Sequence, residues 1–131
     1  MTKYKNDKPK ILVIDDDESN RVSFYNSLTK EGYEVVTAGD YEEALARINE
    51  TDFDLIFADF RLGTRSGLDV LHEINYRNLL VPVIIMTKAP NARSAQESFQ
   101  LGAIGHVSKP LSEEKVVHLT RLVLRNGCND V

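Results

Sequence analysis

Short runs of branched aliphatic residues alternate along this chain with segments whose apolar residues recur every three or four positions. An unbroken apolar run is typical of a strand buried on both faces, and the longer spacing is typical of an amphipathic helix. The pattern predicts five strands: Ile11–Ile14, Tyr33–Ala38, Leu55–Ala58, Val83–Thr87 and a short one within Ala103–Ser108. It also predicts five helices: Ser19–Glu31, one from Asp40, one from Ser66, Asn91–Leu101 and Ser112–Leu124. This alternation predicts an α/β fold with a doubly wound, five-stranded parallel sheet.

The predicted helices differ in their apolar content. Ser19–Glu31 offers two apolar pairs at helical spacing, Phe24 with Leu28 and Val22 with Tyr25. Asn91–Leu101 is instead rich in Ala, Ser and Gln, and Phe99 is a main predicted anchor. So thin an apolar stripe fits an element that can move.

Length and charge exclude several classes of protein. A chain of 131 residues fits one domain, and no apolar run approaches the ~20 residues that span a bilayer. The formal net charge of −4 argues against direct nucleic-acid binding by this domain. The single cysteine, Cys128, excludes an internal disulfide and fits a reducing compartment, so we expect a cytoplasmic protein without membrane contact. We expect a disordered or extended lead-in at residues 1–9, one domain at 10–126 and a tail at 127–131.

Chemically active side chains stand where four of the predicted strands end. They are Asp15 and Asp16, Asp59, Thr87 and Lys109. In an open parallel sheet, ligands bind outside the carboxyl ends of the strands, so these side chains should gather on one rim. Crowded carboxylates cannot all stay ionised without a counterion, and oxygen donors without His or Cys suit a hard cation. The rim therefore predicts a Mg²⁺ site with room for phosphate oxygens, where one acid can attack phosphorus.

Four motifs follow one another along the chain, each at the end of an apolar run: "DD", "DLIFAD", "PVIIMT" and "GHVSKP". Each is common by itself, but all four in this order are specific. In this arrangement the chain, from about Lys10 to Asn126, resembles the receiver domain of two-component response regulators. The resemblance implies the (βα)5 receiver fold with strand order 2-1-3-4-5.

The resemblance also implies a role for each rim residue. Asp59 would accept a phosphoryl group from a sensor histidine kinase or a phosphotransfer protein. Mg²⁺ would be held by Asp16 and Asp59, by Asp15 through water, and by the backbone carbonyl of Arg61. Lys109 would pair with Asp59 or with the phosphoryl oxygens. The domain would catalyse its own phosphorylation and dephosphorylation without forming an external product.

A switch from the rim to a distant face is implied as well. Thr87 would swing to hydrogen-bond the phosphoryl group, and His106 would turn inward with it. The face formed by residues 91–124 would pass the signal to an output domain or effector protein, with a homodimer through this face as one arrangement. In the family the bond corresponding to Lys109–Pro110 is commonly cis.

Four residues depart from the family's common pattern: Arg61, Gly63, Lys88 and His106. Gly63 stands where a proline is frequent, which should loosen the loop Phe60–Ser66. Arg61 and Lys88 add long cationic side chains beside the site. His106 occupies a place where an aromatic residue is frequent, and it is smaller than Tyr or Phe and titratable.

Other functions stay open on the sequence alone. Asp15-x-Asp17 after an apolar strand is similar to the opening motif of haloacid-dehalogenase-type phosphatases, with Asp15 as nucleophile and Asp17 as acid and base. That alternative leaves Asp59 without a role. Crowding by Arg61 and Lys88 also suits a receiver-shaped interaction module that no longer cycles phosphate. A nucleotide-binding flavodoxin-like protein is disfavoured because no Gly-rich loop follows the first strand.

Overall fold

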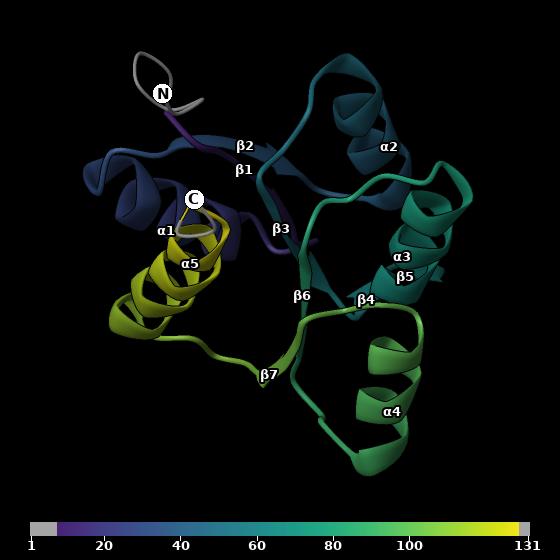
Figure 1. Ribbon diagram of the computed structural model, residues 1–131. Coiled ribbons are helices and arrows are strands. Elements are labelled where there is room, and N and C mark those ends of the chain that lie inside the picture. Colours follow the sequence, from purple (N-terminus) through teal and green to yellow (C-terminus); the bar gives the residue numbers. More distant parts are fainter. Residues whose placement is uncertain (1–7, 129–131) are drawn as a thin grey trace.

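A five-stranded parallel sheet forms the centre of the computed structural model, which describes residues 8–128 (Figure 1). Most of the expected lead-in and the end of the expected tail lie outside the described residues. The strands are β1 (Lys10–Ile14), β2 (Glu34–Ala38), β3 (Leu55–Asp59), β6 (Val83–Thr87) and β7 (Gly105–Ser108). They pair in parallel in the order β2-β1-β3-β6-β7. With β6 and β7 counted as the fourth and fifth strands, this confirms the predicted order.

Helices cover both faces of the sheet. They are α1 (Glu18–Lys30), α2 (Tyr41–Glu50), α3 (Gly67–Tyr76), α4 (Ala92–Gln100) and α5 (Glu113–Cys128). Figure 1 shows α1 and α5 on one face and α2, α3 and α4 on the other, which confirms the doubly wound fold. The last helix continues past its predicted end at Leu124. Among the helices of the described residues, none combines the length and the apolar character that a bilayer span requires.

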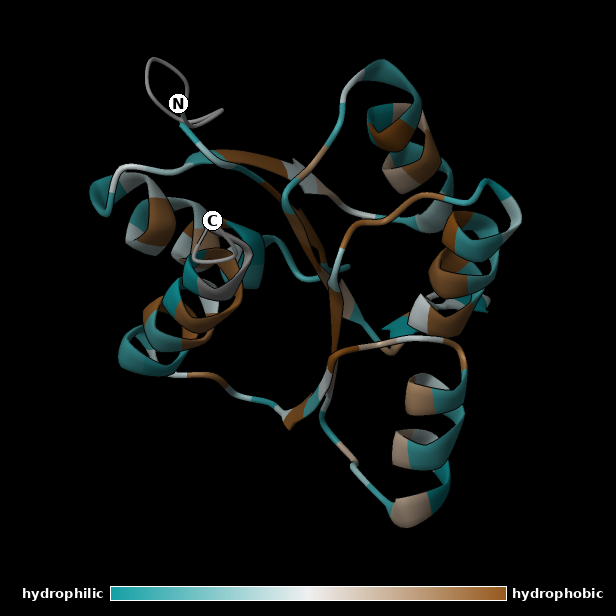
Figure 2. Ribbon diagram, in the orientation of Figure 1, coloured by the Kyte–Doolittle hydropathy of each residue, from teal (hydrophilic) through white to brown (hydrophobic). Residues whose placement is uncertain are grey.

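Alternate residues of β1 supply two separate hydrophobic cores. Leu12 and Ile14 belong to the core under α2 and α3, while Ile11 and Val13 belong to the core under α1 and α5. Successive side chains of a strand point to opposite faces, so an unbroken apolar run serves both cores. Figure 2 shows hydrophobic residues along the sheet and on the helix faces turned towards it. The sheet that carries the rim is therefore packed on both sides.

The two apolar pairs expected on α1 differ in burial. Phe24 and Leu28 are buried and anchor the helix, whereas Val22 and Tyr25 are 51% and 48% exposed. On α4, Phe99 was expected as an anchor, but it is 50% exposed. Two apolar stripes share the same spacing, so periodicity alone does not tell which of them faces the sheet.

Helix α4 differs from the other helices in what it buries. Its buried side chains are Ser94 and Ser98, and it contributes no buried apolar side chain to either core. The Ser94 hydroxyl lies 3.0 Å from His106 Nε2 on β7, and the Ser98 hydroxyl donates to the Ser94 carbonyl at 2.8 Å. Polar contacts thus replace apolar packing where α4 meets the sheet.

Candidate functional site

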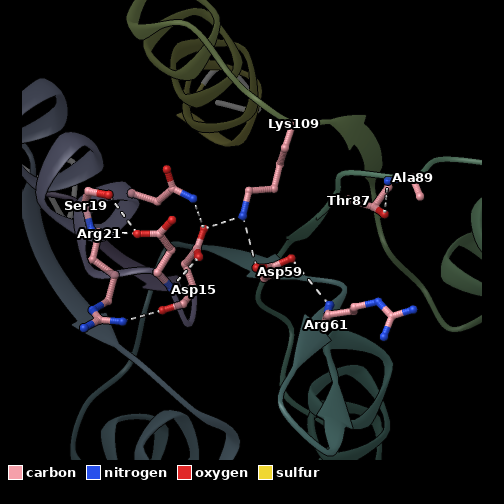
Figure 3. Close-up of polar contacts among 10 residues, drawn as sticks. Asp15, Ser19, Arg21, Asp59, Arg61, Thr87, Ala89 and Lys109 are labelled. Atoms are coloured by element: carbon pink, nitrogen blue, oxygen red, sulfur yellow. Dashed lines mark hydrogen bonds and ion pairs between the residues drawn. The ribbon is translucent and has the colours of Figure 1, made fainter.

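The ammonium group of Lys109 joins two of the strand-end carboxylates (Figure 3). Its Nζ donates to Asp15 Oδ2 at 2.8 Å and to Asp59 Oδ2 at 3.1 Å, and none of the three side chains is more than 8% exposed. Asp15 follows β1, Asp59 ends β3 and Lys109 follows β7, so parallel pairing brings the three residues to one edge of the sheet. The bond Lys109–Pro110 is cis, as the resemblance implied.

Asp16 completes a cluster of three carboxylates on this rim. One oxygen from each of Asp15, Asp16 and Asp59 lies within 4.8 Å of the others, and Asp16 is the exposed member. Hard oxygen donors with one side open to water fit Mg²⁺, which binds few carboxylates and keeps several water ligands. The three acids that the sequence predicted to gather do gather.

The electrostatics of the cluster favour an added cation. Burial raises the pKa of Asp59, the hydrogen bond from Lys109 opposes this, and the Asp15 charge adds to the rise. Burial lowers the pKa of Lys109, but hydrogen bonds to Asp15 and Asp59 outweigh it and leave that pKa raised. The single ammonium therefore pairs with two of the three carboxylates and leaves Asp16 without an ion pair within the described residues. The negative charge that remains uncompensated favours the binding of a divalent cation.

The chain after Asp59 folds back onto the site as a small antiparallel pair, β4 (Arg61–Leu62) with β5 (Arg65–Ser66). Gly63 has a φ of 68° at its turn, a conformation that glycine adopts without strain. Gly67 closes the loop so tightly that a Cβ there would lie 2.7 Å from the Asp59 carbonyl oxygen. Two-residue strands have no periodicity, so the sequence did not predict this hairpin.

Arg61 presents its backbone, rather than its side chain, to Asp59. Its N–H donates to Asp59 Oδ1 at 3.4 Å, and its side chain is exposed. Lys88, the other long cation expected beside the site, is also exposed. Asp16 is exposed as well, so this carboxylate is open to solvent.

Thr87 lies on the rim, but its hydroxyl is engaged with the following loop. Thr87 is 5% exposed, and its Oγ1 accepts a hydrogen bond from the Ala89 N–H at 3.1 Å. A pocket of about 220 Å³ opens beside Thr87 towards α4, and Ser94 also lines it. The half-buried His106 is hydrogen-bonded to Ser94. His106 is therefore tied to a wall of the pocket that Thr87 shares.

Three residues of the loop β1–α1 and of α1 make further contacts beside the carboxylates. Asp17 is the N-cap of α1 and accepts hydrogen bonds from the Ser19 N–H and hydroxyl. The Asn20 side chain donates to Asp15 Oδ2 at 3.4 Å, and Arg21 Nη1 donates to the Asp15 carbonyl at 2.7 Å. The carboxylate that the phosphatase alternative would use as acid and base thus serves as a helix cap in this structure.

Comparisons with known proteins agree with this geometry. Residues 11–121 match the response regulator receiver domain family. The alkaline phosphatase synthesis transcriptional regulatory protein PhoP of Bacillus subtilis is 33% identical over 90% of this chain and 49% of its own length. The transcriptional regulatory protein ZraR of Escherichia coli K12 is 37% identical over 77% of this chain and 23% of its own length. The chain thus spans half or less of these curated relatives.

Solved structures give the same answer. A receiver domain protein (CheY-like) from Methanospirillum hungatei has a TM-score of 0.88 at 25% identity and covers 95% of this chain and 99% of its own. The beryllofluoride-activated NtrC4 receiver domain, solved as a dimer, has a TM-score of 0.83 at 27% identity and covers 89% of this chain and 97% of its own. With the acidic rim, the bridging lysine and the matched family on one chain, the protein belongs to the receiver domains of two-component response regulators.

Proposed function

We propose that Asp59 is the phosphoacceptor and that it takes a phosphoryl group from the phosphohistidine of a sensor histidine kinase or phosphotransfer protein. A receiver domain is a signalling module rather than a classical enzyme, and the proposed chemistry is confined to its own side chain. The bridge from Lys109 to Asp59 and Asp15 carries the proposal, because it fixes the acceptor oxygen beside a cation at the open rim.

In the proposed transfer, an Asp59 carboxylate oxygen forms a bond to phosphorus while the phosphorus–nitrogen bond of the donor breaks. Lys109 holds Asp59 in place and balances charge on the phosphoryl oxygens. Hydrolysis would reverse the change, as water takes the phosphoryl group and restores the carboxylate. Both steps need positive charge at the position where the three carboxylates converge.

Mg²⁺ is the cation proposed there, held by Asp16 and Asp59, by Asp15 through water and by the Arg61 carbonyl. When bound, it supplies the positive charge that stabilises the phosphoryl oxygens. The cluster of three hard-oxygen donors with one exposed member supports this assignment.

The proposed switch links Thr87 to the face formed by residues 91–124. A phosphoryl group on Asp59 offers acceptor oxygens to the Thr87 hydroxyl, and a swing of that hydroxyl towards them would break the hydrogen bond that it accepts from the Ala89 N–H. Movement at Thr87 changes the pocket that Ser94 also lines, and His106 transmits the change between β7 and α4. The bond between Ser94 and His106 supports this route. The proposed switch would shift the equilibrium between two arrangements of α4 relative to the sheet.

Partners follow from the family and its relatives. The curated relatives are transcriptional regulatory proteins of which this chain covers only part. We therefore propose control of an output domain or effector protein, with a homodimer through residues 91–124 as one arrangement. The proposed domain comprises residues 10–126 and works in the cytoplasm, where its kinase presents the phosphohistidine.

Phosphorylation by a small donor tests the acceptor. Acetyl phosphate with Mg²⁺ should add one phosphoryl group to the wild-type chain, detected as a mass increase on the peptide that contains Asp59. Asp59→Asn should remove the product, and Asp52→Asn, a change of another carboxylate in a loop, should not. Label on Asp15, or turnover of phosphate esters, would favour the phosphatase instead. Absence of any phosphorylated product would favour a module that no longer cycles phosphate.

A further inference from the structure

The guanidinium group of Arg21 holds the backbone behind the carboxylate cluster. Arg21 lies on α1, and its Nη1 donates to the Asp15 carbonyl oxygen at 2.7 Å (Figure 3). That carbonyl belongs to the peptide group between Asp15 and Asp16. A change in the orientation of this peptide group would rotate the Asp16 side chain with respect to the rest of the site.

Asp16 depends on its backbone more than the other carboxylates do. The Asp15 side chain is fixed by Lys109 and by the Asp17 N–H, which donates to Asp15 Oδ1 at 3.0 Å. Asp16 is exposed, and within the described residues its carboxylate makes no hydrogen bond or ion pair. Its position near Asp15 and Asp59 is therefore set by the peptide group to which Arg21 is bonded.

The space for this guanidinium is supplied by Gly39, in the turn between β2 and α2. A Cβ at Gly39 would lie 3.0 Å from Arg21 Nη1 and 3.4 Å from Arg21 Cζ. The Gly39 N–H donates to Glu43 Oε1 at 2.8 Å, which ties this turn to α2. Arg21 is half-buried, so the bond is partly shielded from water. One side chain thus joins α1 to the end of β1 beside a fixed turn.

We propose that Arg21 is a positioning residue for the metal site: it holds the peptide between Asp15 and Asp16 so that the Asp16 carboxylate converges with those of Asp15 and Asp59. The inference rests on the proposed magnesium site. Arg21 does not touch the metal in this role, and its effect on metal affinity passes through the backbone. Loss of the bond leaves the exposed Asp16 free to turn into solvent, so Mg²⁺ binding weakens.

Magnesium titrations of three variants test this role. Since the chain has no tryptophan, the Kd is measured from amide chemical shifts and by calorimetry. We expect Arg21→Gln to raise the Kd about 10-fold, equivalent to about 1.4 kcal/mol. Gly39→Ala keeps the arginine but displaces its guanidinium, and should raise the Kd about threefold. Arg121→Gln on α5 removes an exposed ion pair to Glu31 and should leave the Kd unchanged.

The metal-free spectra give a second measurement. The Asp16 and Asp17 amides should shift in Arg21→Gln and Gly39→Ala, while those of α5 should not. A Kd for Arg21→Gln within twofold of wild type, whatever its Tm, would overturn the inference and leave the proposed function intact. A shifted Asp16 amide with an unchanged Kd in Gly39→Ala, beside a weakened Arg21→Gln, would assign the effect to charge and equally overturn positioning. If Arg21→Gln fails to fold, Gly39→Ala and Arg21→Lys decide. A wild-type chain without Mg²⁺ affinity would overturn the proposed function itself.

Discussion

Helices α5 and α4 flank the same end of the sheet but are attached to it by different forces. Helix α5 packs Val116, Val117 and Leu124 into a core shared with α1. Helix α4 buries two serines and is bound to β7 through the hydroxyl of Ser94. Apolar burial is strong and insensitive to small displacements, whereas hydrogen bonds are weaker and depend on direction. The chain thus holds α5 by apolar packing and α4 largely by polar contacts.

The largest loss of stability should come from a substitution in the hydrophobic core that α5 shares with α1. Leu28→Ala removes a fully buried side chain of α1 from the core shared with α5 and should cost about 3 kcal/mol of unfolding free energy. Urea unfolding measures the loss. Leu122→Ala on α5, where the side chain is 44% exposed, is the matched control and should cost less than about 1 kcal/mol. Equal costs for the two variants would contradict the assignment of this core.

A smaller and more local loss of stability should follow when a polar contact of α4 is removed. Ser94→Ala removes the contact with His106 and the capping bond from the Asn91 N–H, and should destabilise α4 by about 1 to 2 kcal/mol. Hydrogen exchange should accelerate in the amides of α4 and not in those of α5. Thr29→Ala, an exposed hydroxyl on α1, serves as the control. Uniform acceleration across the molecule would show that α4 is not a separately released unit.

A substitution in the carboxylate cluster should raise the free energy of unfolding, whereas the two substitutions above lower it. Burial raises the pKa of Asp59 although the Lys109 hydrogen bond opposes it. The stability contributed by such a group is present below its unfolded pKa of about 3.9 and is lost as the pH rises through the folded value. Without Mg²⁺, Asp59→Asn should therefore stabilise the chain at pH 7, by on the order of 1 kcal/mol. The gain should vanish below about pH 4.

Thermal unfolding at several pH values measures that gain, and added Mg²⁺ should reduce it because the ion stabilises only the wild-type site. Asp52→Asn is the control for a general charge effect. If Asp59→Asn is less stable than wild type at neutral pH, the charged Asp59 carboxylate does not destabilise the fold. A stability gain that increases as the pH falls would contradict the prediction as well.

The smallest effect should come from Phe99, the apolar residue that the sequence favoured as an anchor of α4. Because its side chain is 50% exposed, Phe99→Ala should cost less than about 1 kcal/mol. The ring lies 6.5 Å from that of His106, centroid to centroid, so some loss of contact is included. Urea unfolding beside Leu28→Ala gives the comparison. A cost near that of Leu28→Ala would mean that α4 is held by apolar packing after all.

The sheet and the rim were predictable because their signals are local and repeated. A strand buried on both faces gives an unbroken apolar run, and its last residue gives the position of a rim side chain. The sequence therefore predicts that Asp15, Asp59 and Lys109 lie at one edge of the sheet. The strand order came from the resemblance, since alternation alone does not give the order of neighbours.

The parts that the sequence did not predict depend on single contacts between distant elements. The hairpin after Asp59 is too short to have a period, and the exposed stripe of α1 has the same spacing as the buried one. The bond from Arg21 to the Asp15 carbonyl joins a side chain to the backbone, which leaves no trace in a hydrophobic pattern. Such contacts are visible only in the three-dimensional structure. They determine the detailed geometry of the site.

The close approach of Gly67 to the Asp59 carbonyl limits how this receiver can be redesigned. Even a methyl group at position 67 would push the backbone of Asp59 aside. Libraries that vary this loop should therefore diversify the exposed Arg61 and the turn beyond it, and keep glycine at position 67.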